Sequence, residues 1–172
     1  MAKIVGGFWV PHDPVMFVAP DAPKDKEVAA RMWKAYETCG ERMTALGATA
    51  AIIVGNDHYI LFGTNCLTRY LIGIGDVDGP IESLKGLERG VVENHEDLAQ
   101  HIVKCGNDEN FDWAVARSFT VDHAFSIPHQ YVVEVAEKKL GRKIPSIPVY
   151  IASVVDPCIS MKRSRELGDQ IR

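Results

Sequence analysis

The sequence predicts an α/β fold: one domain with three αβα layers, in which helices cover both faces of a mostly parallel sheet. Three observations lead to this prediction. Strand-like apolar runs alternate with helical patterns along the chain. The runs are continuously apolar, as in strands that are buried on both faces. The length of 172 residues, with 47% hydrophobic residues, suits a single ordinary globular domain.

The N-terminal quarter is expected to form a strand, a loop and a long helix. Residues 3–10 are apolar and rich in β-formers, which predicts a buried strand. Residues 11–24 contain four prolines, which block a helix and predict a loop. A helix is expected from about Asp25 to Leu46, because its apolar residues recur every three or four positions. Gly47 is placed to end it.

The middle of the chain is expected to add two strands, a long loop and a second helix. Residues 48–54 form an apolar run that predicts the second strand, and residues 67–75 predict the third. Residues 76–93 carry Gly-Pro and Gly signals, which indicate a loop. A helix capped by Asn94 is then expected to continue through Cys105.

The last third is expected to hold two strands and two helices. Residues 111–119 and 147–152 are predicted as the fourth and fifth strands. Between them, Pro128 is expected to start a helix that ends near Leu140, because proline suits the first helical position. Ser160 is expected to cap a final helix that runs into the C-terminus.

Composition excludes several classes of protein. The formal net charge is −4 and no run of Lys and Arg is present, which argues against a nucleic-acid partner. No apolar stretch reaches the roughly 18 residues of a membrane span, and the first residues lack the layout of a signal peptide. No two cysteines form a C-x-x-C pair, so buried reduced thiols in a cytoplasmic protein are expected. The four cysteines are Cys39, Cys66, Cys105 and Cys158.

Three of the six histidines each follow an apolar run. They are His12, His58 and His123. Strand ends of open α/β sheets meet at one edge, where such proteins do their chemistry. Each histidine taken alone has an ordinary interpretation as a loop or turn residue. Their joint placement favours a shared metal or acid–base site, since imidazole serves both purposes near neutral pH.

The other three histidines give weaker signals. His95 and His101 are six residues apart in a predicted helix, so they do not form an i, i+4 metal pair. Exposed helix surface is the expected location of both. His129 follows Pro128, and packing at a helix start is favoured over a place at the edge of the site.

The residue types specify a chemistry. Two histidines and one carboxylate around a metal with open positions suit non-haem Fe(II) oxygen chemistry. A further histidine could take a proton from a bound phenol. Each of the three histidines also adjoins an aspartate, but neighbours on a strand point in different directions. These aspartates are therefore expected to be turn residues or partners of ligands, and not ligands; they are Asp13, Asp57 and Asp122.

At five places the sequence resembles the class III extradiol ring-cleaving dioxygenases. The matching segments are Lys-Ile-Val-Gly-Gly-Phe at 3–8, Pro-His-Asp-Pro at 11–14, Asn-Asp-His at 56–58, Val-Asp-His at 121–123 and the closing stretch at 167–172. The nearest members are the catalytic β subunit of protocatechuate 4,5-dioxygenase and the gallate dioxygenases. The resemblance extends over nearly the whole chain.

The resemblance implies a role for each of the three histidines. His12 and His58 match the two histidine ligands of the family's Fe(II). His123 matches a histidine beside the substrate that assists proton transfer and oxygen activation. The substrates would be O₂ and a catechol similar to protocatechuate or gallate, whose ring is cut beside the diol. A homo- or hetero-oligomer is expected, because a partner chain could supply the site for a substrate carboxylate.

The resemblance stops short of a complete site. The family has a third ligand, a glutamate, and a further histidine base, both well downstream of the matched region. No residue here matches them, and Glu166 does not lie in the glutamate motif. We therefore expect residues 1–172 to be the N-terminal portion of a longer catalytic subunit. Two alternatives stay open: a non-catalytic metal-binding or interaction module of the same fold, and a zinc-dependent hydrolase.

Overall fold

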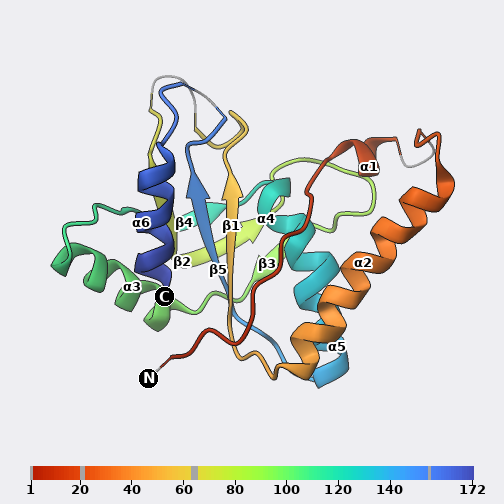
Figure 1. Cartoon of the computed structure of the whole chain (residues 1–172), viewed down its shortest axis with the longest axis horizontal. Helices are drawn as coiled ribbons and strands as arrows, with labels where there is room; N and C mark the ends of the chain where they lie inside the picture. The colour runs from red at the N-terminus through yellow and green to blue at the C-terminus, as the bar shows by residue number, and fades with distance from the viewer. Residues whose placement is uncertain (1, 20–21, 63–65, 155) are drawn as a thin grey trace.

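The protein folds around a curved five-stranded sheet with helices on both sides (Figure 1). The structure is a computed structural model that describes residues 2–19, 22–62, 66–154 and 156–172. The strands are β1 (Ala51–Asn56), β2 (Tyr70–Gly79), β3 (Gly90–Val92), β4 (Ala114–Thr120) and β5 (Ser146–Ile151). The helices are α1 (Val15–Val18), α2 (Lys26–Ala45), α3 (Glu96–Asp108), α4 (His123–Pro128), the π-helical turn η1 (His129–Val133), α5 (Glu134–Leu140) and α6 (Met161–Ile171). The predicted α/β class is confirmed.

The sheet is mixed, which corrects the prediction of a mostly parallel sheet. β1 pairs with β5 and β2 pairs with β4 in parallel, whereas β2 is antiparallel to both β3 and β5. The reason lies in the connection after β1. A parallel return needs a crossover, usually a helix. The chain instead turns back, and Tyr70 of β2 pairs with Ile151 at the same end of the sheet where Asn56 ends β1.

The two faces of the sheet carry separate hydrophobic clusters. Alternate residues of β2 divide between them, because side chains along a strand point to opposite faces. Leu71 and Val77 pack in the cluster under α2, α4, η1 and α5. Tyr70, Ile72 and Ile74 pack in the cluster under α3 and α6. Figure 1 shows these helices on the two sides of the sheet.

The predicted strand at residues 3–10 is wrong. This segment is extended but belongs to no strand, and Trp9 is 99% exposed. Two adjacent glycines, Gly6 and Gly7, leave the middle of the segment without side chains to bury, which weakens a strand. The segment instead runs past the C-terminal end of α2, where it contacts Leu46.

Helix and strand starts differ from the prediction where side chains take unexpected partners. Asn94 does not cap α3; its amide donates to the carbonyls of Gly73 and Gly75, at an irregularity in β2. His95 caps α3 instead, by accepting from the backbone of Leu98. Within the expected loop 76–93, the last residues of β2 pair with the short strand β3.

The helix expected to start at Pro128 begins five residues earlier. Asp122 caps α4 by accepting a hydrogen bond from the backbone N–H of Ala124. Pro128 lies inside the helical run, and the π-helical turn η1 follows it. Proline has no backbone N–H to donate, so the hydrogen-bond ladder is interrupted at the residue just before η1.

The most regular helices follow the prediction. Asp25 caps α2 and Ser160 caps α6, and Gly47 follows the end of α2 with a φ of 64°.

Two of the four cysteines are exposed, Cys66 and Cys158, so the expectation of burial is wrong for both. Among the described residues, no helix is long and apolar enough to cross a membrane.

Candidate functional site

The structure brings the three histidines singled out in the sequence into one cluster. The ring centroids of His12 and His58 are 5.1 Å apart, and those of His12 and His123 are 5.9 Å apart. His58 and His123 stack at 4.6 Å. The Nε2 atoms of His12 and His58 lie 3.3 Å apart, so these two nitrogens converge on one point.

The histidines meet for a different reason from the one the sequence suggested. β4 runs opposite to β1, so their carboxyl ends do not share an edge of the sheet. Instead α4 crosses the end of β1. A Cβ built on Gly55 would lie 3.0 Å from Cβ of Ala124, so glycine permits this close approach. His123 is the first residue of α4 and therefore lies beside His58, two residues after β1.

His12 reaches the cluster from a loop. It follows Pro11, whose carbonyl accepts a hydrogen bond from the Tyr36 hydroxyl of α2. The Asp13 side chain then accepts from the backbone N–H of Val15, the first residue of the short helix α1. Hydrogen bonds thus hold the loop on both sides of His12, although no strand precedes this histidine.

Asp122 orients His58. Its Oδ2 accepts from Nδ1 of His58 at 3.3 Å, while its Oδ1 accepts from the Tyr150 hydroxyl at 2.6 Å and from the backbone of Ala124 at 3.0 Å. The Asp122 side chain is completely buried. With its proton held on Nδ1, His58 presents the lone pair of Nε2 toward His12, as a metal-ligating histidine does.

The electrostatics of the two histidines differ. Burial, followed by the nearby rings of His58 and His123, lowers the pKa of His12. The hydrogen bond to Asp122 raises the pKa of His58 despite partial burial. Two imidazole nitrogens bound to one ion at about 2.1 Å are roughly 3.0–3.4 Å apart. The observed Nε2 separation therefore fits a shared metal once both rings are neutral.

A second set of atoms in the same place could also hold a metal. His58, Asp122 and His123 each offer one ligand atom, and these atoms lie within 4.8 Å of one another. The hydrogen bonds of Asp122 to three partners already occupy both of its oxygens. The expectation that the aspartates support ligands and are not ligands themselves stays a prediction. Asp57 likewise accepts from the backbone of Tyr59 and Leu61 in a turn.

Sequence reasoning missed two residues of the cluster, Glu82 and Tyr150. Oε1 of Glu82 lies 2.5 Å from Nδ1 of His123 and 3.3 Å from its backbone nitrogen. Burial and the charge of Asp122 raise the pKa of Tyr150 well above its ordinary value, so its hydroxyl keeps its proton and donates it. Neither residue has a signal in its local sequence, because each lies far along the chain from its partner.

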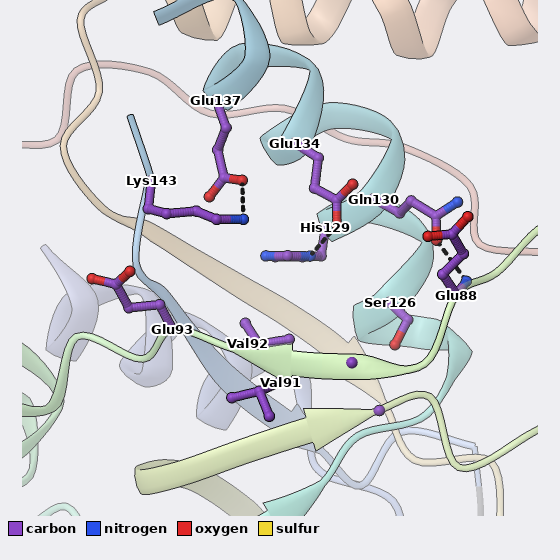
Figure 2. Close-up of a pocket in the computed structure, with 12 residues that line it drawn as sticks. Glu88, Val91, Val92, Glu93, Ser126, His129, Gln130, Glu134, Glu137 and Lys143 are labelled. Carbon is purple, nitrogen blue, oxygen red and sulfur yellow. Dashed lines mark hydrogen bonds and ion pairs between the residues drawn. The ribbon is translucent and has the colours of Figure 1, made fainter. Parts of the chain in front are cut away.

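The remaining histidines lie elsewhere. His101 is on the exposed surface of α3, as expected. His129 lines a cavity of about 360 Å³ between β3 and the run from α4 to α5, and none of the three clustered histidines lines it (Figure 2). Burial lowers the pKa of His129 to about 4, and its Nδ1 lies 3.7 Å from Glu134. The helical run starts at His123, so His129 packs inside it and not at a helix start, and the expected position is wrong.

Replacing Asp122 by alanine is expected to lower the free energy of unfolding by about 3 kcal/mol, measured by urea unfolding. The change removes the acceptor of the Tyr150 hydroxyl, the cap of α4 and the partner of His58. Asp13→Ala is the matched control. Asp13 accepts one hydrogen bond at the surface, so its loss should cost less than about 1 kcal/mol. Equal effects of the two substitutions would show that Asp122 does not hold the cluster together.

The fold, the clustered histidines and their carboxylate partners together define a candidate metal-dependent enzyme, and sequence comparison agrees. Residues 6–172 match the family described as the catalytic LigB subunit of aromatic ring-opening dioxygenase. The chain belongs to this family.

Individual relatives lead to the same class. The chain is 29% identical over 132 residues to 2,3-dihydroxyphenylpropionate/2,3-dihydroxicinnamic acid 1,2-dioxygenases from Escherichia coli strains K12 / DH10B and O157:H7. The aligned part covers 76% of this chain and 39% of each relative. The chain thus spans well under half the length of the relatives that it matches.

Proposed function

We propose that this chain carries the histidine ligands and one proton-transfer histidine of an Fe(II)-dependent extradiol dioxygenase that opens a catechol ring with O₂. One observation supports the proposal most strongly. The Nε2 atoms of His12 and His58 converge at 3.3 Å while His123 stacks against His58. Membership of the ring-opening dioxygenase family supports the reaction class.

The donor set fits the proposed metal. Two imidazole nitrogens with open positions beside them suit non-haem Fe(II), and a carboxylate completes such sites. The resemblance assigns that carboxylate to a glutamate outside the matched stretch. Fe(II), when bound, supplies the redox chemistry that joins O₂ to the catechol. His12 and His58 would hold it, and Asp122 keeps Nε2 of His58 available by holding the proton on Nδ1.

His123 has a separate task in this proposal. Its Nδ1 is held by Glu82, so its other ring nitrogen, Nε2, is the atom that would exchange a proton with a substrate hydroxyl. The ring is nearly buried, which excludes bulk water from this exchange. All four cysteines are free thiols, which suits a reducing compartment, and on that ground we propose a cytoplasmic location.

The test uses the natural protein, meaning the protein as the cell produces it. Its oxygen uptake is measured with protocatechuate, gallate and 2,3-dihydroxyphenylpropionate, after loading with Fe(II) or Zn²⁺ in parallel. We expect uptake with Fe(II) only, together with the absorbance of a ring-opened product. Turnover with Zn²⁺ and no oxygen uptake would favour the hydrolase. Absence of any bound metal would favour a non-catalytic module.

A further inference from the structure

The loop after β2 places a carboxylate against the start of α4. The backbone N–H of Ile81 donates to the carbonyl of Val121 at 2.8 Å, and the N–H of Val121 donates to the carbonyl of Asp78. These two hydrogen bonds hold the segment that bears Glu82 beside the segment that bears His123. Backbone pairing of the residues just before Glu82 therefore holds its segment beside the start of α4.

Glu82 contacts His123 at two points with one oxygen. Its Oε1 lies 2.5 Å from Nδ1 of the imidazole and 3.3 Å from the backbone nitrogen of the same residue. The side chain of Glu82 is 18% exposed and that of His123 is 5% exposed, so water competes little for either contact. An ionised carboxylate only accepts hydrogen bonds, so an ionised Glu82 requires a proton on Nδ1 of His123.

A proton on Nδ1 determines the state of the other ring nitrogen. In a neutral imidazole one nitrogen donates and the other accepts, and the partner of one nitrogen selects the tautomer. Nε2 of His123 is then a bare acceptor. No hydrogen bond to this nitrogen is formed within the described parts of the chain, so it stays available for a substrate proton.

Glu82 differs from a carboxylate that serves only the fold. Glu137 is 8% exposed, and both its oxygens are bonded, one to the backbone of Ile144 and one to Lys143. The second oxygen of Glu82, Oε2, is buried without a hydrogen-bond partner among the described residues. Burial of an unpartnered oxygen is costly, so this atom calls for an explanation beyond the fold.

We propose that Glu82 is a positioning residue that holds His123 in the tautomer with a protonated Nδ1, so that Nε2 faces its reaction partner as a base. The proposal rests on the dioxygenase function proposed above for its kinetic consequence, but not for the tautomer itself. Nothing in the family match or in the named relatives assigns a role to Glu82.

The direct test is the tautomer of His123, measured by long-range ¹H–¹⁵N NMR of the chain at alkaline pH, where imidazoles are neutral. We expect a single Nδ1-protonated form in the unsubstituted chain. Glu82→Ala should give a mixture of both tautomers, because the acceptor is lost. Glu82→Gln retains a carbonyl oxygen of the same reach and should keep the Nδ1-protonated form, which guards against misfolding of the alanine variant.

Glu134→Gln is the matched control. Glu134 is a partly buried carboxylate next to a different histidine, His129, at 3.7 Å. Its substitution should leave the tautomer of His123 unchanged. If Glu82→Ala keeps His123 in the Nδ1-protonated form, or if Glu134→Gln disturbs it equally, the proposal is wrong.

Kinetics of the natural protein give the second readout. Glu82→Ala should lower kcat by about 10–100-fold, the usual effect of losing a partner behind an active-site group. KM and bound iron should stay within about threefold, because neither the substrate nor the iron contacts Glu82 in this proposal. Glu82→Gln should lower kcat by less than Glu82→Ala does. A change in KM alone would overturn the proposal. A natural protein without catechol turnover would refute the proposed function, and the NMR result would still decide the role of Glu82.

Discussion

His12→Ala and His58→Ala are each expected to abolish stoichiometric Fe(II) binding by the natural protein, with a loss of affinity greater than about 100-fold. That value is the upper end of the effect of removing only a partner behind a metal ligand. The expectation follows from the 3.3 Å separation of the two Nε2 atoms, which would let one ion bind one nitrogen from each ring. Metal analysis after gel filtration measures the bound iron.

The fold should survive both substitutions. His12 lies on a loop, and His58 is 26% exposed just beyond β1, so neither contributes much to the core. Circular dichroism and the urea midpoint test this directly. His101→Ala, on the exposed surface of α3, is the control and should leave bound iron unchanged. Retention of iron by either the His12 or the His58 variant would remove that residue from the ligand set.

Elements encoded by local sequence were predicted well. Asp25 and Ser160 cap the helices that follow them, and Gly47 has the positive φ that ends a helix. These signals act within one turn of the chain, so they are visible in a single sequence. The apolar run at 147–152 overlaps β5. It was visible in the sequence because a strand buried on both faces of the sheet has consecutive apolar residues.

Strand direction was not predictable from the same signals. An apolar run looks alike in a parallel and an antiparallel strand, and the direction of β2 depends on a turn back between β1 and β2. The short strand β3 has only three residues, of which Val91 is 90% exposed. Such a segment carries no hydrophobic period, so sequence reasoning assigned it to a loop.

The cluster of histidines was found from the sequence by an argument that proved only partly valid. His58 and His123 do follow strands, but His12 follows an extended segment with no strand partners in the described structure. The rings of His58 and His123 meet because α4 crosses β1 at Gly55, a contact between residues far apart in sequence, and His12 joins them from a loop that bonds to α2. Glu82 escaped prediction for the same reason, since 41 residues separate it from His123.

The hydrogen-bonded partners divide the cluster into two parts with separate supports. Asp122 holds Nδ1 of His58, and Glu82 holds Nδ1 of His123. Each carboxylate therefore directs the Nε2 atom of one histidine. In the function proposed above, the histidine of the first arrangement binds the metal, and the histidine of the second exchanges protons without binding it. Substitutions in the two parts should have separable effects on iron content and on turnover.

His123→Ala is expected to keep iron within about threefold of the unsubstituted natural protein but to lower kcat by about 10²–10⁴-fold, the usual contribution of a general acid or base. The substitution removes the nitrogen proposed to exchange a proton with the substrate, and it leaves the Nε2 atoms of His12 and His58 in place. Oxygen uptake and iron content, measured on the same sample, check the two parts of the expectation.

Loss of packing must be separated from loss of chemistry in this variant. The imidazole of His123 stacks on His58 at 4.6 Å, so alanine leaves a space beside a proposed ligand. His123→Gln fills more of that space without an imidazole, and it should restore the urea midpoint but not kcat. Iron loss as large as that of His12→Ala would make His123 a ligand. If kcat decreases by less than about fivefold, the role of His123 is structural, because general acid–base catalysis contributes far more than that.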